Sequence, residues 1–414
     1  MDSRSEIARV AAEAAARQSY GKLVAWLAAR TRDVAAAEDA LADAFAAALE
    51  RWPRTGVPER PEAWLLAVAR RRRVDAVRRR LTSEAGREHL KLIAEEMEAG
   101  MTDEDLPDER LRLMFACAHP AIEPGIRSPL ILQTVLGFDA ATIASAFLVS
   151  PATMGQRLVR AKTRIRETGI PFRVPERTEL GERLDAVLEA IYAAFAEGWS
   201  DPAGTETRRR NLAGEGIWLG RLVASLMPEE PEALGLLSLM LFAEARRAAR
   251  RDPAGDYVPL AEQDHTLWDG ILVDEAESLL RRAATMGVIG RYQLEAAVQS
   301  AHAARRLTGR TDWVAVRELY DALLSIAGSP VVAINRAVAI AEAEGAVAGL
   351  AALYVLGDDK RLDEYQPYWA ARAGLLARLG QVPQACQAYD RAIGLERDPA
   401  VRRFLQGKRA ALKN

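Results

Sequence analysis

Cysteine, lysine and aromatic residues are scarce in this chain of 414 residues, and long apolar runs are missing. Two cysteines exclude a disulfide-stapled scaffold and a zinc module built from four cysteines. No apolar run approaches the roughly 18 residues of a membrane-spanning helix, and the segment from Met1 to Val10 is charged. We therefore expect neither a membrane span nor a signal peptide, and a soluble, cytoplasmic protein.

Signatures of catalysis are missing as well. The four histidines are scattered, no glycine-rich phosphate loop follows a strand, and no cysteine or serine sits in a recognisable nucleophile motif. Cys117-Ala118-His119-Pro120 is a poor zinc site, because a single Cys-x-His supplies too few ligands. We predict that the chain is not an enzyme and holds no cofactor or metal.

Charge is balanced overall, with 56 basic and 58 acidic residues, but it is unevenly distributed. Residues 1–82 carry 16 basic against 11 acidic residues, residues 83–110 carry 3 against 10, and residues 111–169 carry 7 against 3. The basic residues are 50 arginines and only 6 lysines, so an arginine cluster alone is weak evidence for a binding site. Alternating charge blocks predict a domain at 1–82, an acidic linker at 83–108, a second domain at 109–170 and a C-terminal domain at 175–414.

Helical periodicity runs through nearly the whole chain. Good helix formers dominate, and β-branched residues alternating with period two are missing. Residues 34–50 show the pattern well, with apolar side chains three and four positions apart at Val34, Ala37, Leu41, Ala44, Phe45 and Leu49. An all-α fold is therefore predicted.

The first basic block ends in an arginine-rich helix. Pro61 is suited to a first helical turn, and the helix it opens is predicted to continue to Leu81. Arginines cover most of its circumference, which suits contact with nucleic-acid phosphates. A solvated helix end in an arginine-biased chain explains the pattern equally well. The candidate DNA-binding residues here are Arg60, Arg71, Arg72, Arg73, Arg78, Arg79 and Arg80.

The second basic block has the pattern of a helix-turn-helix. Asp139 is a predicted cap of a short helix, Ser150-Pro151 is a predicted start of the next, and the small Ala144 lets the two cross closely. The second helix would bury an apolar stripe and expose polar and basic residues to base edges and phosphates. An ordinary helical hairpin is the alternative. The candidate DNA-binding residues are Thr153, Gln156, Arg157, Arg160, Lys162 and Arg164.

Together these blocks resemble bacterial extracytoplasmic-function (ECF, group 4) sigma factors, the initiation subunits of RNA polymerase. The resemblance is carried by Ala37-Glu38-Asp39-Ala40-Leu41, Ala44-Phe45, the stretch from Trp64 to Arg70 and the second basic helix. It implies that residues 20–82 bind core polymerase and open the −10 element, and that residues 109–169 read the −35 element. The implied partners are promoter DNA and core polymerase, through its clamp coiled coil and flap. Core contacts are implied for Asp39, Asp43 and Phe45.

The long C-terminal part carries a repeat. Glycines at 309, 345 and 380 and tyrosines at 320, 354 and 389 recur with a period near 34, the length of a tetratricopeptide (TPR) repeat. The chain resembles the sigma-factor subgroup with such a C-terminal extension. Stacked helix pairs form concave surfaces, so a regulatory domain that binds a protein or peptide is expected; an inert stabilising cap is the alternative.

Two other functions stay open at this point. A stand-alone helix-turn-helix regulator with a TPR-like sensor domain would bind DNA without polymerase, and would not need the acidic helix with Asp39 and Asp43. A helical-repeat scaffold or enzyme would use the basic blocks as ordinary bundle helices. The sigma-factor prediction accounts for both basic blocks and for the acidic linker between them.

Overall fold

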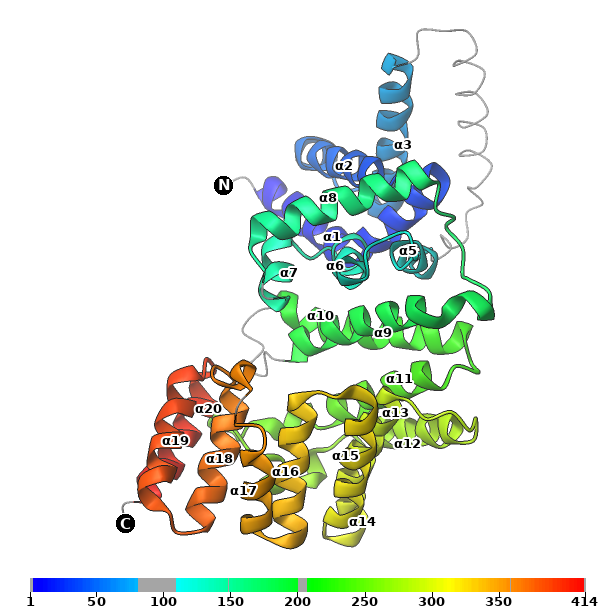
Figure 1. The fold of residues 1–414 in the computed structure, drawn as a ribbon. Helices are drawn as coiled ribbons and strands as arrows, with labels where there is room; N and C mark the ends of the chain where they lie inside the picture. Colours follow the sequence, from blue (N-terminus) through cyan, green and yellow to red (C-terminus); the bar gives the residue numbers. More distant parts are fainter. Residues whose placement is uncertain (1–2, 81–108, 148, 200–206, 358, 413–414) are drawn as a thin grey trace. The chain divides into compact units, whose positions relative to one another are not determined.

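The computed structural model describes residues 3–80, 109–147, 149–199, 207–357 and 359–412 (Figure 1). The predicted all-α fold is confirmed: within these ranges the chain forms helices and no β-strand, and Arg251 and Tyr257 make an isolated bridge. The predicted acidic linker at 83–108 lies outside the described residues. The chain divides into an N-terminal unit, Met1–Ala194, and a C-terminal unit, Phe195–Asn414.

The N-terminal unit begins with three helices, α1 (Ser3–Thr31), α2 (Val34–Thr55) and α3 (Pro61–Arg80). Each packs against the other two, around a core that includes Trp26, Leu41 and Leu65. The Asp33 carboxylate accepts a hydrogen bond from the backbone N–H of Ala36, which satisfies an otherwise unpaired amide at the start of α2.

Among the residues described beyond Arg80, four shorter helices follow in the same unit: α5 (Arg110–Cys117), α6 (Pro124–Thr134), α7 (Ala140–Ala146) and α8 (Pro151–Thr168). They do not stand apart from the first three, because α5 and α6 pack on α1, and α8 packs on α2. The unit also takes in most of α9 (Arg177–Trp199), about 20 residues beyond the predicted boundary at 170–175. The two expected domains thus share one compact body.

Side chains of α9 explain why the unit extends so far. The Arg183 guanidinium is buried and donates to the carbonyl of Phe115 at 2.7 Å. Arg127 on α6 pairs with Glu182 at 3.0 Å, and the Ser128 hydroxyl lies 2.6 Å from a carboxylate oxygen of Glu189. These contacts attach α9 to α5 and α6.

The first part of the C-terminal unit is built around one largely apolar, buried helix, α11 (Pro231–Ala245). It packs against α10 (Thr207–Leu226), α12 (Gly270–Ala284) and α13 (Arg291–Ala303). Gly235 allows the close approach of α13, because a Cβ there would lie 2.6 Å from the backbone nitrogen of Gln293. A helix that is apolar on nearly all sides is typical of a buried core position.

Helices in the rest of this unit pack in chain order. After the short α14 (Arg305–Thr308) come α15 (Trp313–Ala327), α16 (Pro330–Glu344), α17 (Ala346–Tyr354), α18 (Gln366–Arg378), α19 (Val382–Leu395) and α20 (Pro399–Ala411). From α15 to α20, each helix packs on the next. Gly309, Gly345 and Gly380 each have positive φ and each precede a helix that carries one of the periodic tyrosines. Ala373, Leu376, Ala385, Tyr389 and Ala392 lie together in one hydrophobic core.

Candidate nucleic-acid interface

Local side-chain caps stabilise the N-terminal ends of α7 and α8. The Asp139 carboxylate accepts a hydrogen bond from the N–H of Thr142 at 2.8 Å, and the Ser150 hydroxyl accepts one from the N–H of Thr153 at 3.2 Å. Both caps are those predicted, and Pro151 starts α8. Leu148 in the connection lies outside the described residues. Because the connection is short, α7 fixes the direction in which α8 leaves it.

The helix α8 has two distinct faces. Met154, Leu158, Ala161 and Ile165 are buried, as the spacing predicts. The side chain of Arg157 is 40% exposed, and its guanidinium lies 3.7 Å from the carboxylate of Glu123. Because both side chains are open to solvent, this ion pair is weak. Four candidate residues are exposed: Thr153, Gln156, Arg160 and Arg164.

Lys162 has a different environment from the other candidates. Its ammonium lies 2.5 Å from the Glu38 carboxylate on α2, and the two side chains are only 12% and 16% exposed. Burial raises the pKa of Glu38, and the nearby Lys162 charge opposes that rise. Lys162 was predicted to contact DNA because it is a basic residue of the second basic helix. Its partner lies 124 positions away along the chain, so local spacing does not reveal the pair.

The helix α3 places its first arginines toward solvent. Arg60, just before the helix, is exposed, and so are Arg71 and Arg72. Trp64 lies edge-on to the buried Trp52, with ring centroids 5.4 Å apart, so it takes part in packing between α2 and α3. Arg73, Arg78, Arg79 and Arg80 belong to α3, but their side chains are outside the described set.

On α2, acidic and apolar side chains share the solvent-facing side. Asp39 and Asp43 are exposed, and Phe45 is partly exposed. Leu49 is 50% exposed, and Glu50 beside it is also exposed. The spacing of apolar residues predicted that Leu49 belongs to the buried stripe of this helix, and for this residue the prediction is wrong. The structure places it with the carboxylates on a face suited to a basic, partly apolar partner surface.

Residues 16–82 match the sigma-70 region 2 family, and residues 183–284 match a family of unknown function (DUF6596). An uncharacterized protein of Rhizobium meliloti (strain 1021) is 40% identical over 383 residues, which cover 91% of this chain and 89% of that protein. The chain belongs to the family of that protein. No solved structure gives a significant match.

The sigma-70 region 2 domain indicates a sigma-factor-like role in promoter recognition during transcription initiation. Sigma-70 proteins are transcription factors rather than enzymes, and their partners are core RNA polymerase and promoter DNA. In this chain region 2 covers the second half of α1, all of α2 and α3, and the two residues that follow. The DUF6596 match begins inside α9, the helix that crosses from one unit to the other.

Potential metal ligands do not cluster in the part of the chain that the structure describes. No cluster there brings together three histidine, cysteine, aspartate or glutamate side chains that could hold a metal ion. Cys117 lies 3.5 Å from the Thr134 hydroxyl, and burial raises its pKa to about 12. His119 accepts a hydrogen bond from the N–H of Ala121. No described helix is long and apolar enough to cross a bilayer.

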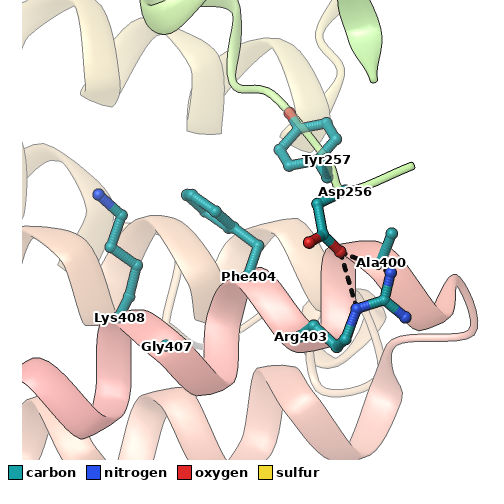
Figure 2. Close-up of a pocket in the computed structure, with 7 residues that line it drawn as sticks. All are labelled: Asp256, Tyr257, Ala400, Arg403, Phe404, Gly407 and Lys408. Atoms are coloured by element: carbon teal, nitrogen blue, oxygen red, sulfur yellow. Dashed lines mark hydrogen bonds and ion pairs between the residues drawn. The ribbon is translucent and has the colours of Figure 1, made fainter. Parts of the chain in front are cut away.

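The C-terminal unit contains a small open cavity between the segment around Tyr257 and α20 (Figure 2). Its volume is about 320 Å³. The Arg403 guanidinium donates to Asp256 at 2.6 and 2.8 Å, and the rings of Tyr257 and Phe404 meet edge to face at 5.5 Å. The cavity lining is completed by Ala400, Gly407 and Lys408.

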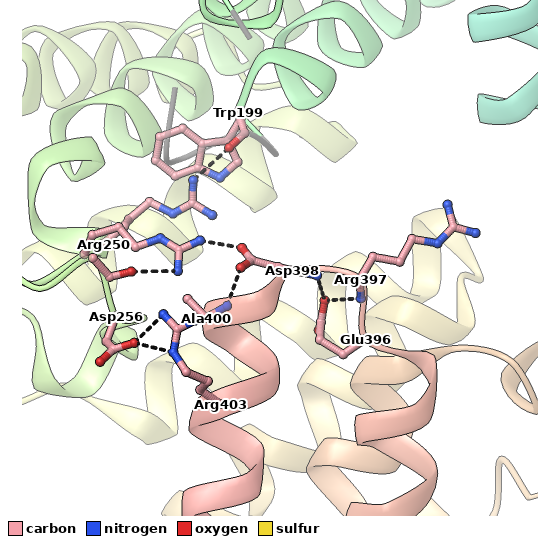
Figure 3. Close-up of polar contacts among 10 residues, drawn as sticks. Trp199, Arg250, Asp256, Glu396, Arg397, Asp398, Ala400 and Arg403 are labelled. Carbon is pink, nitrogen blue, oxygen red and sulfur yellow. Dashed lines mark hydrogen bonds and ion pairs between the residues drawn. The ribbon is translucent and has the colours of Figure 1, made fainter. Parts of the chain in front are cut away.

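Arginines of this unit cap helix ends and join distant segments (Figure 3). Arg250 donates to the carbonyl of Trp199 at the end of α9 and lies 4.1 Å from the centroid of its indole ring. Arg251 forms an ion pair with Asp398, the N-cap of α20. Two further arginines of this unit form ion pairs, Arg221 with Glu275 and Arg247 with Glu244.

Proposed function

We propose that this chain is an ECF (group 4) sigma factor with a TPR-like C-terminal domain that regulates it or binds a protein partner. It would direct promoter recognition, DNA melting and transcription initiation in the cytoplasm. The observation that carries the proposal is the combination, in one chain, of a sigma-70 region 2 domain with a second basic helix, α8, whose N-terminal polar residues are exposed.

We assign reading of the −35 element to α8. Thr153 and Gln156 lie in its first two turns, where a recognition helix meets base edges in the major groove. Arg157 has enough freedom to reach a base or a phosphate, and Arg160 and Arg164 continue the basic surface along the helix. Lys162 joins this set only when its contact with Glu38 is released.

The −10 region is assigned to α3 and the loop before it. Arg60, Arg71 and Arg72 present exposed guanidiniums to the phosphate backbone. Further arginines at 73, 78, 79 and 80 complete the proposed set. Packing against Trp52 favours a structural role for Trp64 over base stacking.

We assign the binding of core polymerase to α2. Asp39 and Asp43 are free to meet a basic surface, and Phe45 and Leu49 add apolar area beside them. We propose that α2 contacts the clamp coiled coil of polymerase and that residues 109–170 contact the flap. The stacked helices of the C-terminal unit would bind a protein or peptide partner.

Run-off transcription tests the proposal. Purified bacterial core polymerase is incubated with a pooled promoter-fragment library, with and without the full chain. New, specific start sites sharing upstream elements are the expected result. Duplex binding without core binding would replace the proposal with a stand-alone regulator, and neither activity would favour a helical-repeat scaffold or enzyme.

A further inference from the structure

Two partly buried arginines of the C-terminal unit, Arg246 and Arg250, bind only to uncharged acceptors. Arg246, at the end of α11, donates to the carbonyl of Phe242 at 3.4 Å and to the side-chain oxygen of Gln299 at 2.8 Å. Arg250, in the 3₁₀ turn that follows, donates to the carbonyl of Trp199 at 2.8 Å. Within the part of the chain that is described, neither guanidinium is paired with a carboxylate.

Carboxylates of the surrounding segments are already bound to other arginines. The pairs are Arg247 with Glu244, Arg251 with Asp398 and Arg403 with Asp256. Figure 3 shows Asp398 and Asp256 in these pairs, and Arg250 turned toward the carbonyl of Trp199. None of the three carboxylates is therefore available to neutralise Arg246 or Arg250.

Helix ends compensate the two positive charges only in part. Trp199 ends α9, Phe242 lies in the last turn of α11, and a helix C-terminus carries about half a negative elementary charge. Burial lowers the pKa of each guanidinium to about 10, so both stay protonated at pH 7. Two helix ends thus leave about one positive charge without compensation, and a charge held partly out of water is costly unless an anion neutralises it.

The two guanidiniums also keep N–H donors for a ligand. Nη1 of Arg246 and both Nε and Nη2 of Arg250 make no hydrogen bond to any described residue, and none of these atoms is sealed from solvent. The Arg250 guanidinium lies 4.1 Å from the ring centroid of Trp199, which stacks on Phe195, so it is oriented before a ligand binds. Burial raises the pKa of Tyr257, and the charges of Arg250 and Arg246 oppose that rise, so the phenol lies near both.

We infer that Arg246 and Arg250, with the Tyr257 hydroxyl, form a binding site for the oxyanion group of a small ligand, either a phosphate or a carboxylate. Guanidinium groups match both kinds of oxyanion in geometry and in charge. The site lies within the C-terminal unit, so the inference does not depend on the sigma-factor function proposed above. A bound oxyanion would stabilise the folded C-terminal unit.

Thermal unfolding of the full chain tests the site with two probes, inorganic phosphate and succinate. Each is added at low millimolar concentration and exchanged against chloride, so that the ionic strength stays constant. At least one probe should raise the unfolding temperature, because a ligand that binds the folded chain stabilises it. The effective probe identifies the oxyanion group. If neither probe raises the unfolding temperature and isothermal titration detects no binding, the inference is wrong.

Arg250→Gln removes one positive charge and keeps an amide that can donate to the carbonyl of Trp199. In chloride this variant should unfold at a temperature no lower than the parent, because a charge without compensation has been removed. Its affinity for the effective probe, measured by isothermal titration, should fall about ten- to a hundredfold. A variant that unfolds earlier than the parent by the same amount with and without the probe would show that Arg250 only caps α9, which would overturn the inference.

Arg251→Gln is the matched control. It makes the same change of charge at the next position, where the guanidinium already pairs with Asp398. This variant should unfold at a lower temperature than the parent in chloride and should keep the rise that the probe causes. If Arg251→Gln loses as much affinity as Arg250→Gln, the probes respond to positive charge in general, and the assignment to this site fails.

Tyr257→Phe tests the hydroxyl alone, because the ring contact with Phe404 is retained. Losing one neutral donor should weaken binding of the effective probe about three- to tenfold. Unchanged affinity of this variant would remove the Tyr257 hydroxyl from the site.

Discussion

Side chains two positions apart on α8 meet different surroundings. Arg160 and Arg164 are exposed, whereas Lys162 between them is paired with Glu38. Each residue turns the helix by about 100°, so two positions separate side chains by about 200° and direct them to opposite flanks. Arginine and lysine on the same helix therefore serve different purposes, and counting basic residues overstates the surface available to DNA.

Arg157→Ala tests the reading face. Removing this guanidinium should weaken binding of −35-containing DNA by about 1–3 kcal/mol. Affinity is compared by fluorescence anisotropy at one fixed salt concentration, with Arg402→Ala in the exposed part of α20 as the control. An unchanged affinity of Arg157→Ala would remove this residue from the interface.

His302 should make the C-terminal unit sensitive to acid. Burial, with help from the charges of Arg246 and Arg305, lowers its pKa to about 4. Because the unfolded chain binds this proton near pH 6.5, the contribution to stability is complete above that pH and is lost as pH falls from 6.5 to 4.

The expected loss over that range is about 1–3 kcal/mol. Thermal unfolding of the full chain and of His302→Gln at pH 7 and pH 4.5 checks it, because subtracting the two profiles isolates this side chain. Parallel profiles would show that His302 does not titrate as stated.

At the scale of elements, short-range signals account for where helices begin. Asp33, Asp139, Ser150 and Asp398 accept hydrogen bonds from backbone amides in the first turns of their helices. Such caps depend on residues two or three positions apart, so they are visible in the sequence. The helix α9 behaves differently, because contacts to α5 and α6 decide which unit its first part joins.

Ser150→Ala should destabilise α8. Losing the hydroxyl that accepts from the N–H of Thr153 costs about 1 kcal/mol. Ser325→Ala is the control, since that hydroxyl bonds to a carbonyl of its own helix and the change should stay within about 0.5 kcal/mol. Chemical denaturation of both variants measures the difference in the free energy of unfolding. Equal effects would show that the Ser150 cap does not stabilise α8.

At the scale of the whole molecule, the boundary inside α9 has consequences for truncation. A chain ending at 173 loses the Arg183 donor to Phe115, and the acidic partners of Arg127 and Ser128. A chain ending at 194 keeps all three. The contacts of α9 thus belong to the stability of the N-terminal unit.

We expect the 1–173 chain to be less stable than the 1–194 chain by at least about 2 kcal/mol, because buried polar groups lose their partners. Thermal unfolding of both truncations gives the comparison. Equal stability would show that the contacts of α9 do not contribute to the stability of the N-terminal unit, in agreement with a domain boundary at 170–175. Comparing transcription by the 1–194 chain with that by the full chain then shows whether the C-terminal unit is regulatory.

The sequence alone determined the helical class, the caps and the two faces of α8, because these depend on residues within one or two turns. The region 2 resemblance was also readable, and the match over residues 16–82 supports it. Only the tertiary structure decided that Lys162 pairs with Glu38, that Gly21 abuts Val135 and that α9 belongs partly to the N-terminal unit. Such contacts join residues far apart in the chain, and their formation depends on how whole helices pack, which no local periodicity specifies.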